Sequence, residues 1–139
     1  MKLHIAIICA LIGFVALANG RTTYRDAMGR NQGSSSTSGN RTTYRDALGR
    51  LRGTAQTCSS GTTYRDAQGR LQGSSRTDSS GRTTYRDSLG RLQGTATTDS
   101  SGRVTYRDAQ GRLQGTATTD SSGHVTYHDA QGRLQGTKK

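Results

Sequence analysis

Six tyrosines recur along the chain at nearly constant spacing, and this repeat constrains the fold more than any other feature. They are Tyr24, Tyr44, Tyr64, Tyr85, Tyr106 and Tyr127, at intervals of 20, 20, 21, 21 and 21 residues. Around each runs a common pattern, clearest in residues 82–102 (RTTYRDSLGRLQGTATTDSSG). A fixed period in this range is typical of architectures in which each repeat packs on its neighbours. We therefore read residues 19–139 as six tandem repeats.

Each repeat reads as two short strands and two turns. The turns are Asp87–Gly90 and Asp99–Gly102 in the fourth copy. Asp at the first position can accept hydrogen bonds from the turn backbone, and Gly at the last tolerates a positive φ. Such turns close β-hairpins. The glycines expected in the first turn are Gly49, Gly69, Gly90, Gly111 and Gly132.

Between the turns, residues alternate with the two-residue period of a strand, and no helical period appears after the N-terminal segment. Strict alternation puts Thr83 and Tyr85 on one face and, in the next strand, Leu92 and Ala96 on one face. We expect the apolar positions to share a core or assembly face: the six tyrosines with Leu51, Leu71, Leu92, Leu113, Leu134, Val104 and Val125. The predicted fold class is all-β.

Two geometries satisfy this pattern, a β-hairpin meander and a β-solenoid in which identical residues stack at about 4.8 Å. The turn chemistry favours the meander. A disordered monomer is the alternative to both, because low hydrophobicity with net positive charge and abundant Gly and Ser is typical of disordered chains.

The N-terminal segment predicts secretion. Residues 1–4 include Lys2, an apolar run follows, and Ala16-Leu17-Ala18 matches the small-x-small pattern of a signal peptidase site. The apolar run is shorter than the roughly 20 residues that span a bilayer. We therefore interpret residues 1–18 as a cleaved signal peptide, with a retained signal-anchor as the alternative. We expect a secreted protein, extracellular or at the cell surface, with no transmembrane segment after cleavage.

The supply of apolar side chains after residue 18 is small: there is no Ile, Phe, Trp or Pro, and the only valines are Val104 and Val125. A single-layer sheet cannot bury its apolar face without a partner. This favours self-assembly, and the first hypothesis is a non-enzymatic homopolymer, a cross-β, amyloid-like filament of an extracellular or biofilm matrix. Cys58, in a turn, is interpreted as drift at an exposed position or as an intermolecular bridge.

The charge supports a second hypothesis. The chain carries 20 Lys and Arg against 9 acidic residues, for a net charge of +11. Arg45, Arg65, Arg86 and Arg107 are expected opposite the Tyr face, where they could bind a polyanion such as an acidic polysaccharide, lipopolysaccharide or extracellular DNA. The same arginines could simply keep assemblies soluble. Ice binding by the Thr-x-Thr pairs at Thr95 and Thr116 is a distant third hypothesis.

We expect no enzyme, no cofactor, no metal and no small-molecule substrate. The aspartates stand mainly at turn starts, where capping explains them. His124 and His128 are four residues apart, roughly 13 Å along a strand, which is too far to share a metal ion. Turn formation accounts for the glycines, so no phosphate loop is predicted.

The residues Tyr106, Asp108, Gly111, Arg112, Leu113, Gly123 and Tyr127 give this chain a resemblance to the YD repeats of Rhs-type secreted bacterial proteins. The resemblance spans residues 22–136. It implies β-hairpin sheets on an extracellular or surface protein; in that family such sheets curl into a shell around a toxin. Here Arg or His stands between Tyr and Asp, where the family has them adjacent. We expect six repeats to be too few to close a shell and, without a cargo domain, no toxin delivery.

Overall fold

Each repeat forms two strands, as the alternation and turns predict. The structure, a computed structural model, describes residues 20–139, so the predicted signal peptide at 1–18 lies outside the described residues. The strands are β1 Gly20–Asp26, β2 Asn31–Ser38, β3 Arg41–Asp46, β4 Leu51–Cys58, β5 Gly61–Asp66, β6 Leu71–Thr77, β7 Arg82–Asp87, β8 Leu92–Thr98, β9 Val104–Asp108, β10 Leu113–Thr119, β11 Val125–Asp129 and β12 Leu134–Lys138.

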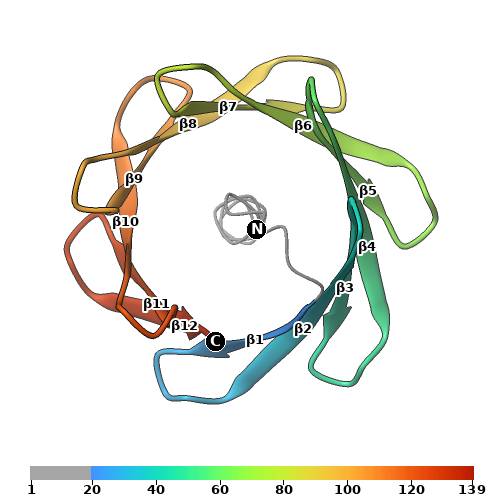
Figure 1. Cartoon of the computed structure of the whole chain (residues 1–139), viewed down its shortest axis with the longest axis horizontal. Helices are drawn as coiled ribbons and strands as arrows, with labels where there is room; N and C mark the ends of the chain where they lie inside the picture. The colour runs from blue at the N-terminus through green and yellow to red at the C-terminus, as the bar shows by residue number, and fades with distance from the viewer. Residues whose placement is uncertain (1–19) are drawn as a thin grey trace.

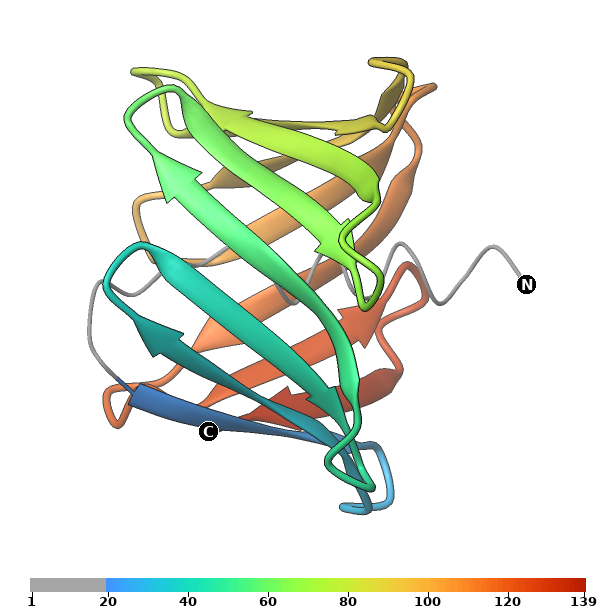
Figure 2. The same cartoon turned by 90° about the vertical axis from the view of Figure 1, so that its right-hand side faces the viewer.

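The twelve strands form one antiparallel meander that closes on itself as a barrel (Figure 1). Every strand pairs with the next in sequence, and β1 pairs with β12. The strands run obliquely to the barrel axis (Figure 2), as closure of a sheet requires. The all-β meander is therefore confirmed and the solenoid alternative is wrong.

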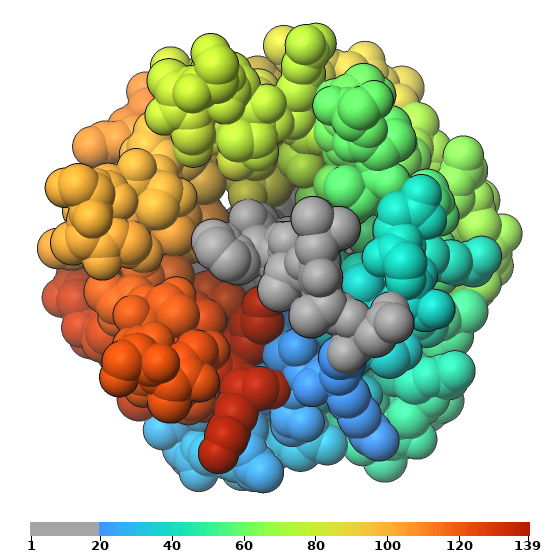
Figure 3. Space-filling view, in the orientation of Figure 1, coloured from blue at the N-terminus to red at the C-terminus, as the bar shows by residue number. Residues whose placement is uncertain are grey.

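Barrel closure covers the apolar face of the sheet within one chain. The sequence predicts a partner layer over the apolar face; in this structure the twelve strands of one chain close on themselves as a barrel instead. The described residues follow one another in chain order around a continuous ring, with the first and last repeats adjacent (Figure 3). A closed sheet faces itself across its interior, so no second layer is needed.

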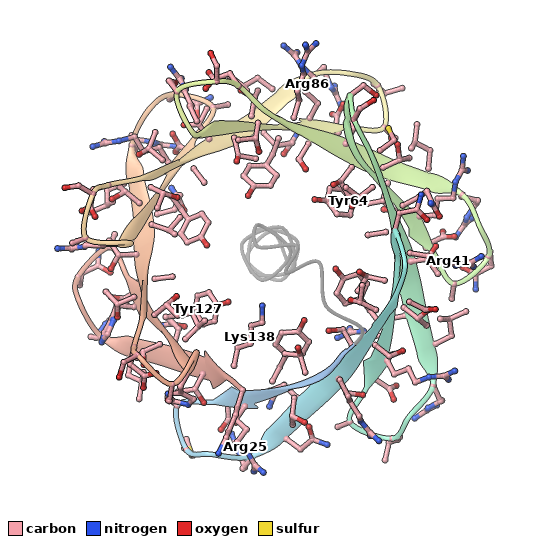
Figure 4. All side chains as sticks on the ribbon, viewed as in Figure 1. Arg25, Arg41, Tyr64, Arg86, Tyr127 and Lys138 are labelled. Atoms are coloured by element: carbon pink, nitrogen blue, oxygen red, sulfur yellow. The ribbon has the colours of Figure 1, made fainter. Side chains whose placement is uncertain are left out.

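The tyrosines line the interior of the barrel, where Figure 4 shows Tyr64 and Tyr127 pointing. Tyr85 is 5% exposed and pairs with Ser75 on one side and Gly94 on the other. Small neighbours of this kind leave room for the ring. Val104 pairs with Ala117, which pairs with Tyr127, so the valine shares the interior face as predicted.

The five leucines do not share that face, and this part of the sequence prediction is wrong. Each strand that begins with the repeat's Leu or Asn carries a β-bulge next to the Tyr strand before it. In the fourth repeat Gly94 pairs with Tyr85 but Leu92 pairs with Arg86, so Gln93 is the extra residue. Paired residues share a face, and the bulge therefore turns the leucine to the outside with the arginine. The leucines are 39–43% exposed: Leu51, Leu71, Leu92, Leu113 and Leu134.

The connections from even to odd strands explain why the repeat length changes from 20 to 21 residues. Between β4 and β5, Cys58 pairs directly with Gly61 and two residues form the turn. Between β6 and β7, the N–H of Asp78 donates to the carbonyl of Arg82 at 2.9 Å, which makes the turn one residue longer. Asp78 Oδ1 accepts hydrogen bonds from the backbone N–H groups of Ser80 and Arg82 at 2.9 and 3.0 Å. The aspartate is therefore a feature of the longer turn, whereas Cys58, at the equivalent position before the shorter turn, is the last residue of β4.

Candidate functional site

The six connections from odd to even strands lie together at one end of the barrel, because the strands alternate in direction. We call this end the Asp-turn rim; its turns are 26–30, 46–50, 66–70, 87–91, 108–112 and 129–133. In the fourth repeat the N–H of Gly90 donates to the carbonyl of Asp87 at 3.0 Å, and Asp87 Oδ1 accepts the N–H groups of Leu89 and Arg91 at 2.9 Å each. The side chain thus fixes the turn from within.

The predicted turn glycines adopt the left-handed backbone conformation that these turns require. Gly90 has φ 79°. The same conformation recurs at Gly49, Gly69, Gly111 and Gly132, with φ between 80° and 83°. That part of the sequence prediction is confirmed.

An arginine that follows the turn is held by the same aspartate. Arg91 Nε donates to Asp87 Oδ2 at 2.8 Å, and the arginine side chain is 72% exposed whereas the aspartate is 17% exposed. Four other pairs repeat this at 2.7–2.8 Å: Arg30–Asp26, Arg70–Asp66, Arg112–Asp108 and Arg133–Asp129. One nitrogen is used for the pair, and the exposed guanidinium can donate further.

The second repeat departs from this arrangement. Elsewhere a glutamine at the bulge also donates to the aspartate, as Gln93 Nε2 does to Asp87 Oδ2 at 3.3 Å. Arg52 stands at that position in the second repeat, where the Arg50–Asp46 distance is 3.5 Å. This turn is less tightly paired and carries an additional positive charge.

The arginine that precedes each aspartate is held by the turn backbone. Arg86 Nη1 donates to the carbonyl of Gly90 at 2.8 Å. The predicted polyanion residues Arg45, Arg65 and Arg107 do the same to Gly49, Gly69 and Gly111, as does Arg25 to Gly29. In the sixth repeat His128 stands at this position. Figure 4 shows Arg25 and Arg86 outside the barrel wall.

Sequence reasoning found one ring of arginines and missed the other. The residues that it missed are Arg30, Arg50, Arg70, Arg91, Arg112 and Arg133. The sequence feature that could have revealed them is the spacing Asp-x-x-x-Arg, because the turn brings these two residues into contact. Counting Arg52, the Asp-turn rim carries twelve arginines and six aspartates, a net +6. Residues 20–139 together carry 19 basic and 9 acidic residues, so more than half of the net +10 lies at this end.

Five aspartates of the rim have a carboxyl pKa below the usual range and are therefore ionised at neutral pH: Asp26, Asp66, Asp87, Asp108 and Asp129. At Asp87 the hydrogen bond from the Arg91 side chain lowers the pKa most, partial desolvation raises it, and hydrogen bonds from the backbone N–H groups of Arg91 and Leu89 lower it further. The ion pairs of these aspartates therefore stay formed, and the surplus of arginines sets the sign of the rim.

The barrel interior is polar as well as aromatic. Tyr24 Oη and Ser35 Oγ are 2.8 Å apart, and so are Tyr64 Oη and Ser75 Oγ. Burial raises the pKa of Tyr106 to about 12. Lys138 also points inward (Figure 4), and burial lowers its pKa.

Residues 20–139 contain no cluster of three or more His, Cys or Asp side chains that could hold a metal ion. Cys58 is exposed and forms no disulfide. In the described part of the chain no helix is long and apolar enough to cross a membrane.

Comparisons with known proteins identify no family for this chain. No protein-family model matches it, and no curated protein matches it. A similar solved structure is that of ASR alternansucrase in complex with isomaltotriose, at 22% sequence identity and a TM-score of 0.24. The match covers 81% of this chain but 10% of the alternansucrase chain, so the protein spans about a tenth of the length of that structure.

Proposed function

We propose that this protein is a secreted, non-enzymatic β-barrel that binds polyanions through its Asp-turn rim. The observation that carries the proposal is that two arginines in a repeat are held by their own turn. Arg86 and Arg91 are both anchored through a single nitrogen, to Gly90 O and to Asp87 Oδ2, while both side chains remain exposed. Side chains that are already ordered lose less entropy when they bind a ligand.

The ligand class follows from this geometry. Anchored guanidinium groups recur once per repeat, two strands and so about 10 Å apart along the sheet. A repeating polyanion, such as an acidic polysaccharide, lipopolysaccharide or extracellular DNA, can contact several of them at once. Binding of this kind weakens steeply as salt concentration rises, because each neutralised charge releases counterions.

The test compares two triple variants with the same change in net charge. R70Q/R91Q/R112Q removes rim arginines, and R76Q/R82Q/R103Q removes three arginines that lie outside the rim. On immobilised heparin, the rim variant is expected to elute at clearly lower salt than the control variant. Equal elution of the two variants would contradict the proposal, since net charge alone would then explain retention. Far-ultraviolet circular dichroism verifies that both variants fold.

A second candidate is the filament, and the seam between β1 and β12 favours it. The seam pairs Tyr24, Arg25 and Asp26 with Lys138, Thr137 and Gly136, and two hydrogen bonds between Thr23 and Lys139 extend it at the chain end, whereas most other strand pairs have five or six residue pairs. This register is the same as that between β4 and β5, where Ala55 pairs with Tyr64. If the seam opens, β12 of one copy can pair with β1 of the next in the native register.

A disulfide across the seam distinguishes the two candidates. The N–H of Thr23 donates to the carbonyl of Lys139 at 2.8 Å, and the N–H of Lys139 to Thr23 at 3.2 Å, so these residues face one another. Thr23→Cys/Lys139→Cys, in a Cys58→Ser background, is expected to abolish any filaments seen by electron cryo-microscopy and to leave heparin retention intact. Filaments that persist in the oxidised variant would rule out growth through this seam. The reduced variant is the control.

A further inference from the structure

The third residue of each turn, which we call its tip, differs between the two sides of the Asp-turn rim. Met28, Leu48 and Leu89 stand at the third position of their turns and are 77%, 75% and 75% exposed. The equivalent residues of the other turns are Gln68, Gln110 and Gln131. Three of four successive turns, from β1 to β8, therefore have an apolar tip, whereas both turns from β9 to β12 have a polar one.

Each apolar tip stands between arginines. Met28 lies between Arg25, which donates to Gly29 O at 2.8 Å, and Arg30, which donates to Asp26 Oδ2 at 2.7 Å. An exposed apolar side chain adds nothing to the electrostatic attraction between a cationic rim and a polysaccharide or DNA. It does match a surface that offers anionic groups above an apolar layer.

The backbone of each tip is already satisfied within its turn. The N–H groups of Met28, Leu48 and Leu89 donate to the aspartate two residues earlier, at 2.9 Å in each case. Moving an unpaired amide out of water is costly. A tip whose N–H is paired can therefore enter the boundary between headgroups and acyl chains at a lower cost.

We propose that the arc of the Asp-turn rim that bears Met28, Leu48 and Leu89 docks on an anionic lipid bilayer, with the apolar tips in the headgroup boundary and the flanking arginines on lipid phosphates. The inference rests on the proposed function and names its partner. Apolar burial and attraction to anionic lipids add in interfacial binding, which is why neither neutral lipid nor a lipid-free polyanion would use the whole surface.

The experiment exploits the residues that the chain itself uses at this position. M28Q/L48Q/L89Q gives every turn a glutamine tip, and Q68L/Q110L/Q131L gives every turn an apolar one; neither changes the net charge. Co-sedimentation is measured with vesicles of phosphatidylglycerol and phosphatidylcholine, and with phosphatidylcholine alone. Heparin retention of each protein is measured in parallel.

The glutamine variant is expected to lose about ten-fold or more in affinity for the anionic vesicles, and the leucine variant to gain affinity. Heparin elution is expected to stay the same in both. An unchanged vesicle affinity in the glutamine variant, or no binding of the natural protein to anionic vesicles, overturns this inference. Loss of heparin retention in the natural protein overturns the proposed function instead. If the glutamine variant fails to fold, the leucine variant decides, because a folded leucine variant without a gain also overturns the inference.

Discussion

Lys138 pairs with Tyr24 across the seam of the barrel, at the position where Ala55 pairs with Tyr64 inside the chain. The seam thus places a cationic side chain in the interior where other repeats have a small one. Burial lowers the pKa of Lys138, which shows that the interior disfavours its charged form.

Lys138→Ala is therefore expected to stabilise the barrel, raising Tm by a few degrees. Three of the other repeats have alanine at this position and two have serine, and alanine removes a charge that the interior solvates poorly. Thermal unfolding followed by circular dichroism measures the effect. Lys139→Ala, at the exposed chain end, is the control and is expected to leave Tm nearly unchanged. A lower Tm for Lys138→Ala would mean that the lysine makes a net favourable contribution at the seam.

Gly90 and Gly94 are required for different reasons, and substitutions at the two positions distinguish these reasons. A Cβ at Gly94 would overlap the carbonyl oxygen of Arg107 on the neighbouring strand, whereas a Cβ at Gly90 would meet nothing within 4 Å. Gly90 needs its positive φ of 79°. Gly94→Ala is expected to cost about 2 kcal/mol or more through overpacking, and Gly90→Ala about 1 kcal/mol through backbone strain.

Asparagine distinguishes the two causes, because it tolerates the left-handed conformation better than alanine does. Gly90→Asn is expected to recover most of the stability lost in Gly90→Ala. Gly94→Asn is expected to be no better than Gly94→Ala. Urea denaturation measures all four variants. Recovery at Gly94 would contradict the close approach of the two strands.

The tyrosines of the barrel interior predict unfolding at alkaline pH. Burial raises the pKa of Tyr106 to about 12, against about 10 in an unfolded chain. A raised pKa contributes stability that is fully present below pH 10 and is lost as the pH rises towards 12. Above pH 10, phenolate absorbance is therefore expected to increase over the same pH range in which the sheet signal in circular dichroism is lost. Phenolate formation near pH 10 with an intact sheet would show that the rings are accessible.

The sequence predicted what depends on neighbouring residues and failed where the outcome depends on register. Repeat length, turn glycines such as Gly90 and the shared face of Val104 and Tyr106 all follow from local turn chemistry and alternation. Strict alternation places Leu92 inside, because it cannot show that Gln93 is an extra residue in the ladder. A one-residue change of register moves every later side chain to the other face.

Barrel closure could not be predicted either, because it depends on strand tilt and stagger summed over the whole sheet. Only the structure shows that β1 and β12 are neighbours, through pairs such as Tyr24 with Lys138. The second arginine ring was visible in the sequence as a spacing. Without the turn geometry, however, nothing indicated that Arg91 and Asp87 form a pair that leaves the guanidinium exposed.

Asp108 connects the stability of its turn with the charge of the rim, and two substitutions separate these roles. Its Oδ1 accepts the N–H groups of Gln110 and Arg112 at 2.9 Å, and its Oδ2 accepts Arg112 Nε at 2.7 Å. Asp108→Asn keeps an oxygen for the backbone and loses an exposed ion pair, so only a small loss of stability is expected. Asp108→Ala also removes the backbone acceptor and is expected to be clearly less stable than Asp108→Asn. Urea denaturation measures both.

The same Asp108→Asn substitution frees Arg112 and adds one positive charge to the rim, so heparin is expected to retain this variant to a higher salt concentration. Asp120→Asn at the opposite end of the barrel is the matched control. Asp120 accepts the N–H groups of Ser122 and His124 at 2.9 Å, and its carboxylate is 3.9 Å from His124 Nδ1. Its replacement changes the net charge equally but frees no rim arginine. If both variants shift heparin elution by the same amount, total charge sets binding and the rim is not the site.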